Sequence, residues 1–206
     1  MLPKKYINRK ETLMCGETYH VYNKAVGNEL LFRKIDDYEY FLEKLSRFIH
    51  KVANIYAYCL IPNHFHLLIK IKESNEIPAL ANIDEDDYSK YLMRILSNFF
   101  NSYSKSYNKI HQRQGRLFTQ PFKRIIVEDE NYFLVLINYI HRNPLHHGLV
   151  KQFSEWNYSS YQAFLTYKTT GIDRDEVLSY FDSLVDFVEY HEENKTKPGM
   201  DELYLE

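Results

Sequence analysis

Two histidines two residues apart in an apolar segment have the spacing of a metal site. The segment IPNHFHLLIKI, residues 61–71, carries His64 and His66 with Phe65 between them. Successive side chains of a β-strand point to opposite faces, so both imidazoles would lie on one face and Phe65 on the other. An ion held by two imidazoles needs a further ligand and keeps open coordination positions. Such positions can polarise a phosphate oxygen, whereas the alternative interpretation is an incidental pair of structural histidines.

A second candidate group lies on a predicted helix over residues 129–142, with the sequence DENYFLVLINYIHR. Tyr139 and Asn143 are four residues apart and would share one helix face. Tyr132, seven residues before Tyr139, lies on the same margin of the apolar stripe, so spacing alone does not choose between the two tyrosines. For any one of nineteen tyrosines, packing against the core is the alternative to chemistry.

The elements that would position these residues follow from β-propensity and helical spacing. Strands are predicted over residues 17–26, 55–61 and 64–71 and within 113–128. Helices are predicted over residues 36–52, 88–111 and 129–142, with two or three more towards the C-terminus. The third helix is expected to stop before Asn143 and Pro144, because a residue that precedes a proline avoids the helical region.

This order of elements predicts an α+β fold. We expect a ferredoxin-like antiparallel sheet of four to five strands with helices packed on one face, plus C-terminal helices. The other face of the sheet would then be open to a ligand.

Charge is distributed unevenly along the chain of 206 residues, although its net charge is only −2. Residues 88–127 contain eight Lys and Arg, many aromatic residues and no Asp or Glu, whereas residues 173–206 contain eleven acidic and three basic residues. A basic, aromatic segment suits nucleic acid, and the alternative is a solvated helix face. The candidate DNA contacts are Lys105, Lys109, Arg113, Arg116, Lys123 and Arg124.

Three features of the sequence bear on where in the cell the protein is expected. No segment approaches the ~20 apolar residues of a membrane helix, and the first residues lack the apolar centre of a signal peptide. Cys15 and Cys59 are far apart and form no CxxC motif, which fits a reducing compartment. We therefore expect a cytoplasmic protein without a membrane partner.

The motifs occur together in a distinctive order. NHFH is similar to the His-hydrophobe-His (HUH) motif of single-strand endonucleases. With GETYHVYNKAVGNELLF, YCLIPNHFHLLI, GRLFTQPFKR, YIHRNPLHHGLV and WNYSSYQAF, the chain resembles the REP-associated tyrosine transposases and related insertion-sequence transposases, over roughly residues 15–165. The most specific feature is PNHFHLLI followed about seventy residues later by YIxxNP.

The resemblance implies roles for the candidate residues. His64 and His66 would bind a divalent metal, Mg or Mn, and Tyr139 rather than Tyr132 would be the catalytic nucleophile. The third ligand in the family lies one turn after the tyrosine, which here is Asn143. Relatives in the wider superfamily have the longer Gln at that place.

The resemblance also implies an activity and a domain organisation. Residues 1–150 would form an HUH catalytic domain, and residues 151–206 a helical extension packed on it with an acidic tail. The activity would be that of a transposase, a metal-dependent single-stranded DNA endonuclease and strand transferase that recognises hairpin DNA and cuts through a 5′-phosphotyrosine intermediate. The alternatives are a non-cutting domesticated hairpin DNA- or RNA-binding module, and a phosphodiesterase that uses water. Both monomers and homodimers occur among such relatives.

Overall fold

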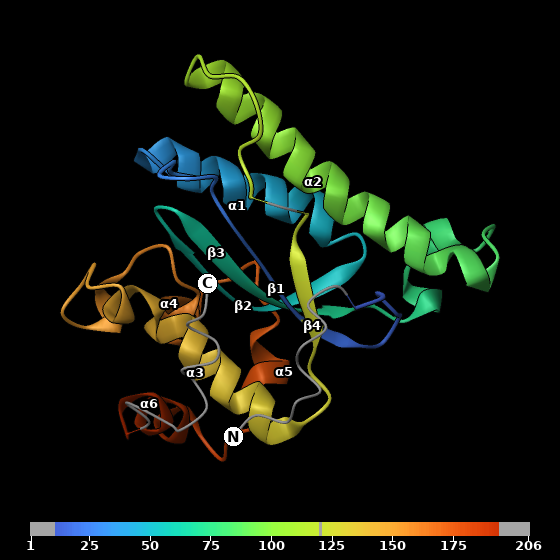
Figure 1. The fold of residues 1–206 in the computed structure, drawn as a ribbon. Helices are drawn as coiled ribbons and strands as arrows, with labels where there is room; N and C mark the ends of the chain where they lie inside the picture. Colours follow the sequence, from blue (N-terminus) through green and yellow to red (C-terminus); the bar gives the residue numbers. More distant parts are fainter. Residues whose placement is uncertain (1–10, 120, 194–206) are drawn as a thin grey trace.

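One antiparallel sheet of four strands organises the chain in the computed structural model, which describes residues 11–119 and 121–193 (Figure 1). The strands lie in the order β2-β3-β1-β4, with the bounds β1 Thr18–Lys24, β2 Ala53–Ile61, β3 His64–Ile71 and β4 Lys123–Ile126. The long helices are α1 Ile35–Ile49, α2 Tyr88–Ile110 and α3 Glu130–His146. The succession β1-α1-β2-β3-α2-β4 with this strand order is the ferredoxin-like arrangement. The predicted α+β fold is therefore confirmed.

Shorter elements connect and follow this core. Three short 3-10 turns lie between β3 and α2: η2 Ser74–Glu76, η3 Pro78–Leu80 and η4 Glu85–Asp87. After α3 come η5 Phe153–Glu155, α4 Tyr161–Phe164, α5 Arg174–Leu178 and α6 Leu184–Glu193. The C-terminal helices are thus present as predicted, while the part of the acidic tail beyond residue 193 lies outside the described residues.

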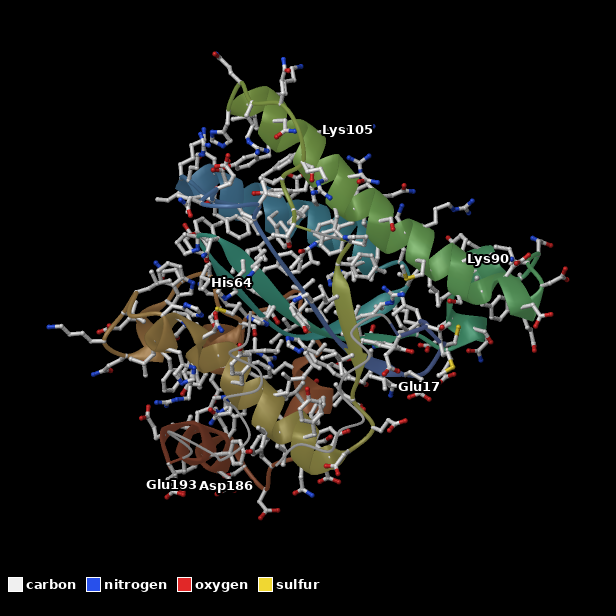
Figure 2. The ribbon with its side chains drawn as sticks, in the orientation of Figure 1. Glu17, His64, Lys90, Lys105, Asp186 and Glu193 are labelled. Atoms are coloured by element: carbon white, nitrogen blue, oxygen red, sulfur yellow. The ribbon has the colours of Figure 1, made fainter. Side chains whose placement is uncertain are left out.

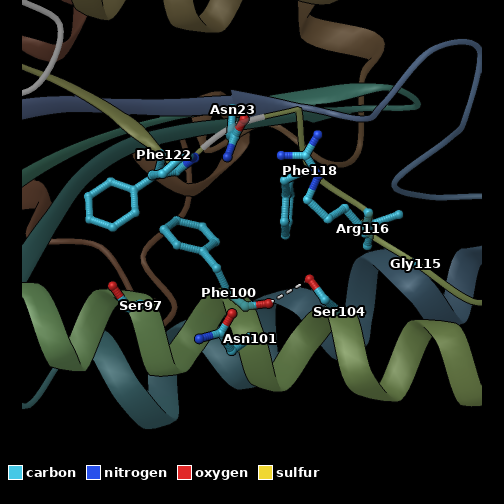
Figure 3. A pocket seen from close by; sticks show the side chains of 11 residues that line it. Asn23, Ser97, Phe100, Asn101, Ser104, Gly115, Arg116, Phe118 and Phe122 are labelled. Atoms are coloured by element: carbon cyan, nitrogen blue, oxygen red, sulfur yellow. Dashed lines mark hydrogen bonds between the residues drawn. The ribbon is translucent and has the colours of Figure 1, made fainter.

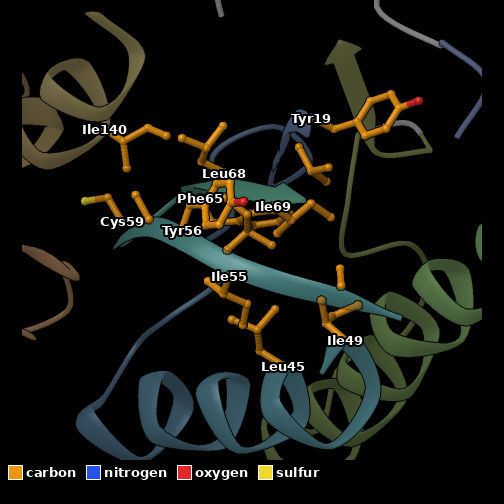
Figure 4. Close-up of a cluster of buried hydrophobic side chains, with 14 of the residues drawn as sticks. Tyr19, Leu45, Ile49, Ile55, Tyr56, Cys59, Phe65, Leu68, Ile69 and Ile140 are labelled. Carbon is orange, nitrogen blue, oxygen red and sulfur yellow. The ribbon is translucent and has the colours of Figure 1, made fainter. Parts of the chain in front are cut away.

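Helices cover both faces of the sheet (Figure 1). On one face, the ring of Phe65 contacts Phe41 of α1 and Phe100 of α2, with centroid distances of 5.2 and 5.3 Å. Helix α3 lies against the opposite face, and Figure 4 shows Ile140 of α3 and Leu45 of α1 on opposite sides of β2. The expectation that all helices pack on one face and leave the other open differs from the structure. Strands β2 and β3 are buried along most of their length, so both of their faces need an apolar cover.

The C-terminal extension closes the outer edge of β2. The backbone N–H of Leu60 donates to Tyr158, that of Ser160 donates to Tyr58, and that of Asp173 donates to Ile55, at 2.8–2.9 Å. An edge strand that is covered in this way has fewer open hydrogen-bonding groups for another chain to pair with. The segment after residue 150 is therefore packed on the sheet as well as on α3.

Helix α3 begins as predicted but ends later. The carboxylate of Asp129 caps it by accepting the backbone N–H of Tyr132 at 2.9 Å. The helix then passes through Pro144 and ends at His146, so the predicted end at residue 142, before Asn143 and Pro144, was wrong. Pro144 falls in the last turn, where its missing N–H removes only one intrahelical bond, and His147 N still donates to the Asn143 carbonyl at 3.1 Å.

None of the helices in residues 11–119 and 121–193 has both the length and the apolar character needed to cross a bilayer.

Candidate functional site

The two histidines of NHFH lie at the start of β3, a central strand of the sheet, on the face that α3 covers. His64 and His66 are 5% and 0% exposed, and their ring centroids are 5.2 Å apart in a T-shaped arrangement. Phe65 between them points to the other face. The predicted placement of both imidazoles on one face is confirmed.

Helix α3 brings its two predicted residues to this pair. The ring of Tyr139, 1% exposed, lies edge-on to His66 with a centroid distance of 5.3 Å. One turn later, Asn143 Oδ1 is 3.1 Å from His64 Nε2. Tyr132 sits two turns nearer the start of the same helix, beside its N-cap. A single chain therefore assembles His64, His66, Tyr139 and Asn143.

The hydrogen bonds of His64 suit a cation. Its Nδ1 lies 2.9 Å from Asn63 Oδ1 and its Nε2 lies 3.1 Å from Asn143 Oδ1, so the ring faces two amide oxygens. A neutral imidazole has a single N–H and can donate to only one of these oxygens. At the other oxygen, the lone pair of the ring nitrogen faces a lone pair of the amide oxygen, and the two repel each other. A cation between His64 Nε2 and Asn143 Oδ1, or a rotated Asn143 amide, removes this repulsion. Asn143 Nδ2 is buried and has no hydrogen-bond partner among the described residues.

Burial keeps these imidazoles neutral. It lowers the pKa of His64 to about 3, with a further lowering by His147 and an opposing effect of the contact with Asn143. Burial also places the pKa of His66 well below its usual value, assisted by His20 and His64. Neutral imidazoles carry the lone pair that a metal requires, so the donor set of two rings and one amide oxygen fits a divalent ion.

Strand β1 contributes residues that the sequence analysis missed. His20 Nε2 is 2.9 Å from His66 Nδ1, and Tyr22 stacks on His20 with a centroid distance of 4.7 Å. Lys24 pairs directly with His64 in the β1–β3 register. Residues 20, 22 and 24 alternate with the same period as the two motif histidines, so this pattern was the available signal.

The six predicted DNA contacts lie in different places. Lys123 is on β4 beside the site, with its Nζ 5.2 Å from the Tyr22 ring, while Arg124 donates to the Glu11 carbonyl.

Lys105 and Lys109 are exposed on α2, which lies on the other face of the sheet; Figure 2 labels Lys105 there and His64 on the sheet. Arg113 forms an ion pair with Glu29 at 2.9 Å, and Arg116 is exposed. Of the six, Lys123 is the one that the structure brings to the histidine face.

Arg116 lines a cavity that is separate from the histidines. This cavity of about 450 Å³ lies between α2 and residues 115–118, 121 and 122 (Figure 3). Its apolar wall is made by Phe100, Phe118 and Phe122. Asn23 reaches it from the α2 face of β1, whereas the neighbouring Tyr22 faces the histidines.

The three histidines that follow Tyr139 have different surroundings. His141 is fully buried and hydrogen-bonded to His191 and Ser160, so it belongs to the packing of the C-terminal extension. His146 is near the Tyr139 ring, at a centroid distance of 6.3 Å. His147 is exposed, and its ring is 4.7 Å from that of His64. His147 therefore marks the solvent side of the site.

Comparisons with known proteins concern first the sequence and then the fold. No family model matches the chain. The chain is 26% identical, over 110 residues, to a Haemophilus influenzae protein whose name assigns it to the REP-associated tyrosine transposases; the match covers 51% of this chain and 57% of that protein. The chain thus spans a little over half the length of this curated relative.

The second finding concerns the fold. A solved structure of a REP-associated tyrosine transposase bound to a REP hairpin superposes with a TM-score of 0.57 at 17% identity, over 76% of this chain and 83% of that one. The two proteins therefore share a fold. With the sequence match, this confirms the resemblance of the chain to the REP-associated tyrosine transposases.

Proposed function

We propose that the chain is a transposase-type, metal-dependent endonuclease and strand transferase for single-stranded DNA that carries a hairpin. One observation carries the proposal: Tyr139 contacts His66, and Asn143 on the same helix contacts His64, in a buried site within one chain. The curated relative supports it by its assignment, and the solved relative by the REP hairpin it binds.

His64 Nε2, His66 Nε2 and Asn143 Oδ1 are the atoms we assign to a divalent ion. The Nδ1 atoms of the two rings face Asn63 and His20, so we assign the Nε2 atoms to the ion. Mg²⁺ or Mn²⁺ is the choice that the resemblance to the transposases implies, and an octahedral ion that keeps several waters has positions left for a phosphate, unlike a closed tetrahedral zinc. When bound, the ion would polarise the scissile phosphate.

Tyr139 is the proposed nucleophile. Its Oη attacks phosphorus in line, the bond from phosphorus to O3′ breaks, and a 5′-phosphotyrosine and a free 3′-OH result. Overall, the phenolic proton passes through solvent to the departing 3′ oxygen, because a free tyrosine with a pKa of about 10 is protonated at neutral pH. The covalent link retains the phosphodiester bond energy, so attack by another 3′-OH joins strands.

The cations divide between two surfaces in this proposal. Lys24 and Lys123 flank the histidine pair and suit the phosphates on either side of the cut. Lys105, Lys109 and Arg116 remain predicted contacts for the hairpin. The division into a catalytic domain over residues 1–150 and an extension over 151–206 also remains a proposal; it is supported by the packing of residues 158–160 on β2.

The test uses end-labelled single-stranded hairpin oligonucleotides, with Mg²⁺, Mn²⁺ or chelator, on a denaturing gel. We expect a metal-dependent protein–DNA adduct that is lost in Tyr139→Phe and kept in Tyr132→Phe, the matched control on the same helix. Cleavage without an adduct in Tyr139→Phe would instead indicate a phosphodiesterase that uses water. Tight binding without any cleavage by the wild-type chain would indicate a non-cutting hairpin-binding module.

A further inference from the structure

His20 is a polar neighbour of His66 on the sheet. Its Nε2 is 2.9 Å from His66 Nδ1, and the two rings stack at a centroid distance of 5.1 Å. Both side chains are almost completely buried, at 1% and 0% exposure. Because His20 Nε2 is already engaged by His66, that atom is not free to bind an ion.

Strand pairing holds His20 in this place. In the β1–β3 register Tyr22 is opposite His66, so His20 is a diagonal neighbour on the same face. The ring of Tyr22 stacks on His20 with an interplanar angle of 26°. A side chain held by two strands and a stacked ring has little freedom to move, which is what a residue that orients another requires.

The hydrogen bond between the two rings contains one proton, which gives two arrangements. If His66 Nδ1–H donates to His20, then His66 Nε2 carries a lone pair. If His20 Nε2–H donates to His66, then His66 Nε2 carries a proton and cannot bind a metal. His20 Nδ1 has no hydrogen-bond partner among the described residues, so no second bond of that ring fixes its tautomer.

We propose that His20 is a positioning residue: by accepting the Nδ1–H of His66, it selects the tautomer and the ring orientation in which His66 Nε2 binds the divalent ion. Asn63 has the same relation to His64, since its Oδ1 lies 2.9 Å from His64 Nδ1. Each proposed histidine ligand thus has an acceptor at its second nitrogen, as metal-binding histidines generally do. The inference rests on the proposed metal site and adds a residue that contacts neither metal nor DNA.

Calorimetric titration of the full chain with MnCl₂ tests the role of His20. In His20→Phe the ring volume is kept but the acceptor is lost, and we expect Mn²⁺ affinity to fall by about 10- to 100-fold. In His20→Gln the Oε1 atom can take the place of Nε2, so affinity should return to near the wild-type value. The matched control is His191→Phe, which breaks a similar buried histidine pair away from the site and should leave affinity unchanged.

The outcomes separate this inference from the function on which it depends. A wild-type chain that binds no Mn²⁺ overturns the proposed metal site itself. Wild-type binding with an unaffected His20→Phe variant, or with a His20→Gln variant as weak as His20→Phe, overturns only the role of His20.

Nuclear magnetic resonance of the wild-type chain with ¹⁵N-labelled histidine and Mg²⁺ shows which ring nitrogens carry protons, and it tests the inference even if the His20 variants fail to fold. We expect the proton of His66 on Nδ1 in the Mg²⁺-bound protein. A proton on His66 Nε2 in that state would overturn the metal site together with the inference, whereas a proton on His20 Nε2, or a metal-induced shift of His20 Nδ1 that marks His20 as a ligand, would overturn only the role of His20.

Discussion

Two buried histidine pairs, made of the same chemical groups, have different surroundings. His20 and His66 join β1 to β3 with a ring nitrogen distance of 2.9 Å, and His141 and His191 join α3 to α6 at 2.8 Å. In the second pair the remaining nitrogens are also bonded, His141 Nε2 to Ser160 Oγ at 2.8 Å and His191 Nδ1 to the Phe187 carbonyl at 2.7 Å.

On the sheet, His20 Nδ1 has no hydrogen-bond partner among the described residues, and the ring of His66 faces that of Tyr139. A buried polar group that is fully bonded within the chain contributes to stability, whereas one that is left open carries a cost that a ligand can offset. The comparison indicates a structural role for the pair at α6 and agrees with the role proposed for the pair on the sheet.

The pair at α6 also shows why arrangement alone is not evidence of catalysis. A chain of hydrogen bonds runs from Ser160 to His141 and on to His191, in the order of the nucleophile, the base and the orienting group of a hydrolase. All three are completely buried, and Ser160 Oγ is also bonded to the backbone of Tyr58. No substrate reaches such a group, so the chain of hydrogen bonds serves to dock α6 and residues 158–160 on α3.

The largest expected effect is a loss of stability in acid. Burial, assisted by Arg142, lowers the pKa of His191 from 6.5 to about 4 in the folded chain. The unfolded chain therefore binds this proton more readily, and the free energy of unfolding should be unaffected above about pH 6.5 and decrease as the pH falls towards 4. For His191 alone the loss would be roughly 2–3 kcal/mol at pH 4.5.

Urea unfolding between pH 7.5 and 4.5 measures this loss. The His191→Phe variant should show a shallower pH dependence than the wild-type chain, because it lacks the titrating group. The same slope in both proteins would contradict the assignment of acid sensitivity to the α6 pair.

The second prediction separates the two pairs at neutral pH. His191→Phe leaves His141 Nδ1 without its partner and should lower the free energy of unfolding by about 1–3 kcal/mol, with no change in Mn²⁺ affinity. His20→Phe should lower Mn²⁺ affinity whatever its effect on stability. Chemical denaturation and metal titration of both variants make the comparison, and a His191→Phe chain that loses metal affinity would contradict it.

The smallest expected effect concerns charge around the pairs. Lys24 and Lys123 lie beside the sheet pair, whereas α6 carries Glu189 and Glu192. Lys123→Gln should therefore weaken single-stranded DNA binding and lower the slope of log affinity against log salt by about 0.7. Lys105→Gln on α2, a predicted hairpin contact, is the comparison on a strand without a hairpin, and equal changes would mean that such a strand contacts both faces. An unchanged slope in Lys123→Gln would remove the contact beside the histidines.

Regular spacing made much of the site predictable. The period of two placed His64 and His66 on one face, and the spacing of four placed Tyr139 and Asn143 on one helix face. Both patterns depend on local backbone geometry, which the order of residues determines. For the same reason the strands and helices were predicted close to their observed bounds.

Contacts between distant segments were decided only by the tertiary structure. The partnership of His20 with His66 depends on the register of β1 against β3, and a shift by one residue would turn His20 to the other face. The cover of both sheet faces, and the docking of His191 on His141, depend on how apolar surfaces far apart in the chain bury one another. The sequence by itself determined which residues could do chemistry; the folded sheet decided which of their neighbours hold them in place, because that choice rests on packing and register rather than on local spacing.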